Sequence, residues 1–166
     1  DTFTVPSGVT VNMSSATQTG VGGVNTPAFS VKQSSAQTGI ADQTGTQIIF
    51  QAEDFDSDSA YDTSNGRFTV PSGEGGKYYL WGQIRTNSSG TMSRMNVSLY
   101  KNGSSVISQW NANQTSSGEA TAGCGWTGTL AAGDYIQVRL YQNSGSAVNA
   151  ESGNGKCIFY GYKIIE

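Results

Sequence analysis

Apolar and polar residues alternate in short runs along most of the chain after residue 26, and each run ends at turn-forming residues. Such period-two runs predict β-strands with one buried face. We expect strands at 28–32, 47–51, 67–70, 78–84, 94–100, 105–110, 120–130, 135–141 and 157–165. Many short strands joined by tight turns predict one all-β sandwich or jelly roll over residues 27–166.

Turn signals support this interpretation. Asn102 and Gly103 lie between two alternating runs, and Asn-Gly tolerates the positive φ angles of a two-residue hairpin turn. Asn65-Gly66 and Gly133-Asp134 predict further turns between strands.

The first 26 residues have a different character. Phe3 and Val5 precede a Pro-Ser-Gly turn, Val9 and Val11 follow it, and a tract rich in Ser, Thr and Gly comes next. Four apolar side chains cannot offset the cost of ordering this segment, about 1–2 kcal/mol per residue for the backbone. We therefore expect residues 1–26 to form a β-stem shared between chains, with a disordered linker as the alternative.

Composition and charge exclude several functions. The chain of 166 residues has 10% aromatic and 13% charged residues and a net charge of -3, so disorder is not expected. It contains no His, which excludes Ser-His-Asp and Cys-His nucleophile pairs and His-assisted zinc sites. Without a basic excess or a long apolar stretch, neither nucleic-acid binding nor membrane insertion is expected.

Several motifs, in order along the chain, carry a resemblance to a known family. They lie at 55–56, 61–71, 76–80, 99–103, 130–136 and 159–162. Together they resemble the globular head of complement C1q, which belongs with the tumour-necrosis-factor-like jelly rolls. The Gly-Glu-Gly-Gly sequence at 73–76 extends the turn that the family has there.

The resemblance implies a ten-strand jelly roll that assembles as a homotrimer, with one sheet against the threefold axis. Alternation along the strand near residue 80 then places Tyr79 and Trp81 toward the axis. Tyr78, Leu80 and Ile84 would face the core of their own subunit.

In the last strand the same mapping places Phe159 at the trimer interface. Tyr160 and Tyr162 would then point inward. The alternative is that all these aromatic side chains belong to the core of a monomer.

The two cysteines admit two interpretations. A disulfide is common when a secreted chain has two Cys. The resemblance instead implies that Cys124 and Cys157 lie on strands that flank a third strand, and on opposite faces of the sheet. That separation exceeds what a disulfide spans, so two free thiols are predicted.

Acidic residues cluster between 53 and 62, and Asp54, Asp56 and Asp58 are spaced like ligands of a calcium loop. The glycine and the final glutamate of such a loop are replaced by Ser59 and Asn65. We expect a solvated acidic loop, with no metal and no cofactor, and keep a calcium site as the alternative. No pair of carboxylates is placed across a cleft, so we do not expect an enzyme.

Aromatic rings beside amide side chains are the usual means of binding carbohydrate, because sugar C–H faces stack on rings while amides bond hydroxyls. Trp110, Asn111 and Asn113 form one such stretch, and Tyr141 and Asn143 form another. These are the candidate ligand-binding residues. The alternative is that the rings cap the edge of the core.

The Val-Pro-Ser-Gly-Val-Thr-Val opening and the composition rich in Ser, Thr, Gly and Asn resemble bacteriophage tail-fibre sequences. We therefore expect a non-enzymatic, trimeric fibre knob on a virion surface that recognises a cell-surface glycan or protein receptor. The alternative is a secreted, extracellular C1q-like recognition protein.

Overall fold

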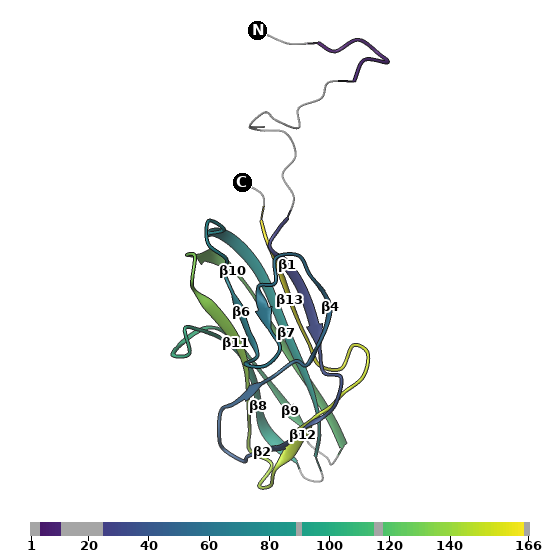
Figure 1. Ribbon diagram of the computed structural model, residues 1–166. Helices are drawn as coiled ribbons and strands as arrows, with labels where there is room; N and C mark the ends of the chain where they lie inside the picture. The colour runs from purple at the N-terminus through teal and green to yellow at the C-terminus, as the bar shows by residue number, and fades with distance from the viewer. Residues whose placement is uncertain (1–3, 11–24, 89–90, 115–117, 165–166) are drawn as a thin grey trace.

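The computed structural model describes residues 4–10, 25–88, 91–114 and 118–164. This part of the chain holds thirteen strands and no helix, and the strands form two antiparallel sheets packed as a sandwich (Figure 1). The all-β jelly-roll prediction is confirmed. There are more strands than the ten implied by the resemblance, because short strands such as β5 (Tyr61–Asp62) form in the connections.

The first sheet, sheet I, is built around the long central strand β7. Its hydrogen-bonded order is β2 (Gln37–Ile40), β12 (Val148–Ala150), β7 (Gly76–Ser88), β13 (Ile158–Lys163), β1 (Ala28–Lys32) and β4 (Ala52–Asp56). The remaining strand, β10 (Gly118–Leu130), pairs along the other side of β7.

The second sheet, sheet II, covers the inner face of the first. Its order is β5, β6 (Arg67–Thr69), β11 (Tyr135–Gln142), β8 (Met92–Lys101) and β9 (Ser105–Gln114). A short strand, β3 (Thr46–Ile48), pairs with β11. Strands β9 and β10 therefore lie at neighbouring open edges of the two sheets (Figure 1).

The core follows the predicted alternation in β7. Tyr78, Leu80 and Ile84 are fully buried, whereas Tyr79 and Trp81 lie on the outer face of sheet I and are half-buried. Burial raises the pKa of Tyr78 to about 12, and its hydroxyl donates to the Glu74 carbonyl at 2.6 Å. The hydroxyl of this buried tyrosine thus has a hydrogen-bond partner at the end of the core.

The predicted faces of β13 were wrong. Phe159 is fully buried and packs edge-on against Phe29, with ring centroids 4.9 Å apart. Tyr160 and Tyr162 instead lie on the outer face beside Tyr79, with centroids 6.4 and 5.5 Å from its ring. Large aromatic rings lie on both faces of this strand, so the alternation of residue types alone did not determine which face is buried.

The Asn-Gly hairpin between β8 and β9 is confirmed. Asn102 has φ 52° and Gly103 has φ 73°, as a turn with two positive φ angles requires. The Asn102 side chain also fastens the turn to the start of β11: its Oδ1 accepts from Tyr135 N at 2.9 Å and its Nδ2 donates to Asp134 Oδ1 at 2.8 Å.

Cys124 and Cys157 are free, as predicted. Both are buried, and they lie on the two sides of β7. Both face the core, so the expected placement on opposite faces was wrong: Cys157 is two residues before Phe159 and shares its side of the sheet. Intervening β7 keeps the thiols apart. Burial raises the pKa of Cys157 to about 11, so its thiol stays protonated at neutral pH.

Part of the N-terminal segment is described. Residues 4–10 are exposed, Val5 and Val9 among them, and a turn forms in which Val9 N donates to Pro6 O at 3.2 Å. Phe3 and Val11 lie outside the described residues. The β-stem over residues 1–26 stays a prediction.

Candidate ligand site on the outer face of β8, β9 and β11

A row of polar side chains crosses the outer face of sheet II. Asn111 on β9 pairs with Asn96 on β8, and Asn96 pairs with Tyr141 on β11. Directly opposed residues of antiparallel strands project to the same side. The neighbours Met95 and Val97 are fully buried in the core, so this row faces outward.

The other predicted amides lie beside this row. Asn113 is exposed and shares the outward parity of Asn111. Asn143 Oδ1 accepts from the backbone N of Arg94 at 2.8 Å, and its Nδ2 donates to Ser93 Oγ at 2.8 Å. The structure thus brings four of the five predicted ligand residues onto one surface.

Two arginines that the sequence analysis missed lie on the same face. The Arg94 guanidinium lies 5.0 Å from the centroid of the Tyr141 ring, and its Nε donates to Asn96 Oδ1 at 3.2 Å. Arg139 lies 4.3 Å over the Tyr100 ring. Cation–π contacts of this kind restrict both groups to defined positions.

These side chains surround a small pocket of about 190 Å³. Its lining residues are Gly45, Arg94, Asn96, Ser98, Tyr100, Gln109, Arg139 and Tyr141. The sequence signal for the missed residues was the polar alternation at 94–100 and 137–141. Only the register between the strands shows that they form one surface.

Trp110 does not belong to this pocket. It is 62% exposed and pairs with Val97, so it projects from the opposite side of β9. There it borders a second pocket of about 390 Å³ between the open edges of β9 and β10. The other lining residues are Trp81, Ser108, Gln109, Gly123, Cys124 and Gly125.

Glycines on β10 give this second pocket its shape. A Cβ on Gly123 would lie 2.9 Å from Trp81 Cζ2, and one on Gly125 would lie 3.1 Å from Trp81 Cε3. The Trp81 ring therefore lies flat across two positions without side chains. Ser108 Oγ donates to Gly125 O at 2.8 Å and ties the two open edges together.

The outer face of sheet I carries a stripe of aromatic side chains. Phe55, Tyr160 and Trp81 lie in one cross-strand row, which Ser30 completes between the first two. Phe55 is 55% exposed. Tyr162 and Tyr79 form the next row, so the stripe spans β4, β13 and β7.

Comparison with protein families identifies the domain. A model described as "C1q domain" matches residues 28–164, most of the chain. The chain belongs to the C1q family. The family resemblance inferred from the sequence motifs is confirmed, and C1q-like domains are typically non-enzymatic recognition modules. Comparison of the sequence with curated proteins finds no match.

Solved structures resemble this C1q domain in fold. The globular domain of zebrafish complement 1qA protein has 18% identity and a TM-score of 0.53, over 84% of this chain and 98% of that chain. Murine APRIL has 13% identity and a TM-score of 0.63, over 82% and 98%. Eiger TNF from S. frugiperda has 14% identity and a TM-score of 0.58, over 84% and 92%.

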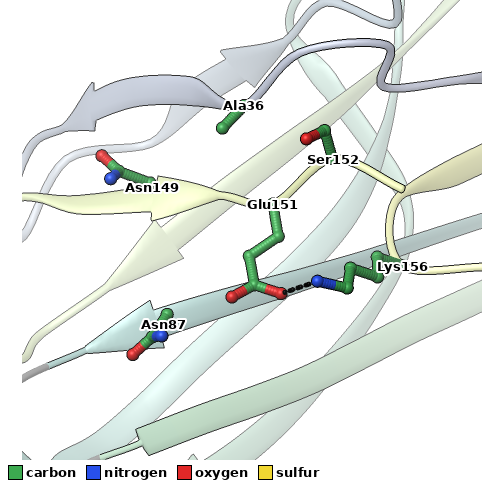
Figure 2. Close-up of a pocket in the computed structure, with 6 residues that line it drawn as sticks. All are labelled: Ala36, Asn87, Asn149, Glu151, Ser152 and Lys156. Carbon is green, nitrogen blue, oxygen red and sulfur yellow. Dashed lines mark ion pairs between the residues drawn. The ribbon is translucent and has the colours of Figure 1, made fainter.

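The C1q domain has a third, polar pocket of about 360 Å³ near β12, shown in Figure 2. Its lining residues are Ala36, Asn87, Asn149, Glu151, Ser152 and Lys156. Lys156 Nζ lies 3.0 Å from Glu151 Oε2, so the two charges in this pocket compensate each other. We regard this pocket as a weaker ligand site than the one on sheet II.

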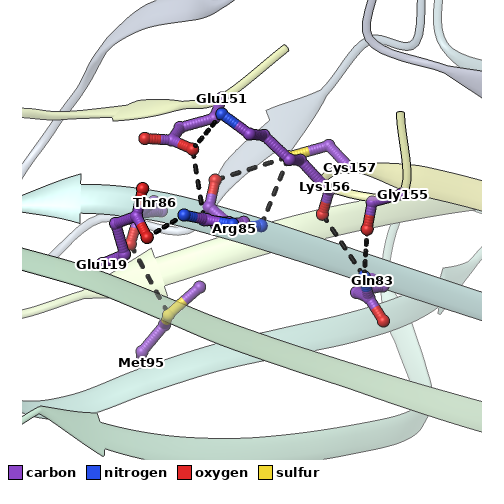
Figure 3. A network of polar contacts seen from close by, with 9 residues as sticks. All are labelled: Gln83, Arg85, Thr86, Met95, Glu119, Glu151, Gly155, Lys156 and Cys157. Atoms are coloured by element: carbon purple, nitrogen blue, oxygen red, sulfur yellow. Dashed lines mark hydrogen bonds and ion pairs between the residues drawn. The ribbon is translucent and has the colours of Figure 1, made fainter. Parts of the chain in front are cut away.

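A polar network beneath this pocket has a structural role (Figure 3). Arg85 on β7 pairs with Glu119 on β10 and, through Nε at 3.2 Å, with Glu151 Oε2. Gln83 Nε2 donates to Gly155 O at 2.7 Å. The network therefore holds the loop after β12 against the centre of sheet I.

The acidic candidates for calcium binding each have a separate partner. Asp54 pairs with Lys32, Asp56 Oδ2 accepts from Tyr61 N at 2.7 Å, and Asp58 accepts from the Ser57 hydroxyl. Within the described ranges, no group of three or more His, Cys, Asp or Glu is arranged to hold a metal ion. The same residues include no helix with the length and apolarity of a membrane span.

Proposed function

We propose that this C1q domain is a trimeric, non-enzymatic recognition module that binds a glycan on the outer face of β8, β9 and β11. The observation that carries the proposal is the row of Asn111, Asn96 and Tyr141 beside a pocket. Amides that bond hydroxyls, set beside an aromatic ring, match the chemistry of a sugar.

The aromatic stripe on sheet I supports the trimer. Exposed Phe55, with Tyr79, Tyr160 and Tyr162, makes an apolar patch of a kind that monomers rarely leave in solvent. C1q and TNF-like members are typically trimeric. The pocket beside Trp110 is a second patch, different from the aromatic stripe. If the stripe of one subunit contacts the Trp110 pocket of the next, and a threefold rotation relates the subunits, three copies form a closed ring.

We further propose a virion fibre as the carrier, with residues 1–26 as its stem. In one chain Val5 and Val9 are exposed, and two further copies around the axis would cover them. The alternative carrier is a cellular, extracellular C1q-like recognition protein, which fits the family match equally.

Light scattering is expected to give three times the chain mass of 17.4 kDa. Tyr160→Asp should shift the protein to monomer, because it places a charge in the aromatic contact. Thr69→Asp, at an exposed position of sheet II, is the control and should remain trimeric. A monomeric wild-type protein at micromolar concentration would reject the assembly.

A glycan array is expected to show binding by the wild-type protein. Asn111→Ala and Tyr141→Ala should each reduce it about tenfold, because each removes a group that contacts the sugar. The matched control is Asn149→Ala, which removes an exposed amide from the β12 pocket. Absence of binding to any glycan would reject the ligand class, and binding unaffected by the first two substitutions would reject the site.

A further inference from the structure

Most cations of this domain are already paired with carboxylates. Five of them form ion pairs among the described residues: Lys32, Arg85, Lys101, Lys156 and Lys163. Arg67 lies close enough to Asp62 to help lower the pKa of that carboxyl, to which hydrogen bonds from Ser64 contribute more. In a chain with a net charge of -3, cations without such a partner are the exception.

Arg94 and Arg139 are that exception on sheet II. Neither forms an ion pair with a carboxylate of the described residues, and no acidic residue lines the pocket that they share. Two guanidinium groups thus give one pocket a positive charge that nothing in its lining compensates.

Both groups also keep hydrogen-bond donors for a ligand. A guanidinium has five N–H donors. Arg94 uses its Nε for Asn96, and neither of its terminal nitrogens bonds a described residue. Arg139 Nη2 donates to Gly103 O at 3.1 Å and to Gln137 Oε1 at 3.5 Å, while its Nη1 bonds no described residue. The tyrosine beneath each guanidinium restricts its plane, which lowers the entropy lost on binding.

From this charge and these donors we infer that the pocket binds an acidic sugar, one whose carboxylate is held by Arg94, while Arg139 adds positive charge at the other end of the pocket. The inference rests on the glycan-binding function proposed above and names its ligand class. Arginine binds carboxylates with paired, charge-assisted hydrogen bonds. Gln109 in the same lining is exposed; its Oε1 accepts from Ser98 Oγ at 3.4 Å, and its amide NH2 is left to bond a ring hydroxyl.

The size of the pocket restricts how much of the glycan it holds. At about 190 Å³ it is smaller than the clefts that enclose a drug-sized ligand. It therefore accommodates a single acidic sugar unit of the glycan. Gln109 lines both this pocket and the one beside Trp110, so the two adjoin across β9.

The test compares two small sugars that differ only at C6: methyl β-glucuronide, which carries a carboxylate, and methyl β-glucoside, which does not. Saturation-transfer NMR and calorimetric titration with the full chain should show binding of the glucuronide at least about tenfold tighter. Raising the salt concentration should weaken glucuronide binding more than glucoside binding, because only the former involves charge.

Arg94→Gln should remove this preference, and Arg139→Gln should weaken it. The matched control is Arg67→Gln, which removes an arginine that also lies over a tyrosine, 4.4 Å from the Tyr135 ring, but outside the pocket. Circular dichroism would establish that each variant is folded. A preference retained in Arg94→Gln, or lost equally in the control, overturns the inference.

The outcomes also separate this inference from the proposed function. Equal binding of the two sugars, or binding only of neutral glycans on the array, overturns the acidic ligand and leaves glycan recognition standing. If no sugar binds, acidic or neutral, both proposals fail.

Discussion

Replacing Phe159 with Ala is expected to lower the free energy of unfolding by about 3–5 kcal/mol, the usual cost of removing a buried Phe side chain. Phe159 is fully buried, and its ring contacts those of Phe29, Phe50 and Tyr61 at centroid distances of 4.9, 6.0 and 6.1 Å. The deletion would leave a cavity between the sheets that these rings cannot fill. Denaturant unfolding at fixed protein concentration measures the change.

Tyr160→Ala is the matched control, since it removes a ring from the next residue on the other face of β13. At protein concentrations too low for a trimer to form, its free energy of unfolding should change by less than about 1.5 kcal/mol, because the ring is partly exposed. If Tyr160→Ala proved more damaging than Phe159→Ala under these conditions, the burial of Phe159 would be contradicted.

Gly161→Ala is expected to destabilise the domain by about 1–3 kcal/mol through overpacking. A Cβ at this position would overlap Leu80 Cδ2 and lie 2.7 Å from the Tyr79 carbonyl oxygen. The Leu80 side chain can move, but the carbonyl belongs to the paired strand β7 and cannot move without disturbing the ladder. Thermal unfolding should show the loss as a lower Tm.

Two further variants make this expectation specific. Gly45→Ala is the control, because a Cβ there meets no atom within 4 Å and the backbone does not have a positive φ. The double variant Gly161→Ala with Leu80→Ala should lose less stability than the sum of the single changes, since the smaller side chain relieves part of the overlap. Strict additivity would mean that the overlap with Leu80 does not cause the loss.

The alternation of residue types determined much of the fold. In β7, β8 and β11 every second residue is mostly Val, Leu or Ile. These positions lie on one face of each strand, because side chains alternate between the two faces, and that face is buried. The turn at Asn102 and Gly103 could likewise be predicted from its own residues, since the ability to adopt a positive φ angle depends mainly on the residue type. Such features need no knowledge of what lies across the sheet.

The tertiary structure alone decided two other features. In β13 both parities carry large rings, so the buried face depended on the glycine at 161, which lets Leu80 and Phe29 pack closely and turns Phe159 inward. Similarly, Trp110 and Asn111 are neighbours in sequence but lie on different surfaces: Trp110 lines the pocket between β9 and β10, and Asn111 lies in the polar row on the outer face of sheet II. Consecutive residues of a strand project to opposite sides.

The candidate ligand site shows the same division. The sequence by itself identified Asn111 and Tyr141 as residues suited to sugar binding, but not the arginines beside them. Asn96 and Tyr141 are far apart in the chain and meet through the register of β8 with β11. That register depends on core packing and on pairing along the whole strand, which no local pattern contains. Only the assembled sheet could therefore show that Arg94 and Arg139 share one pocket without a carboxylate.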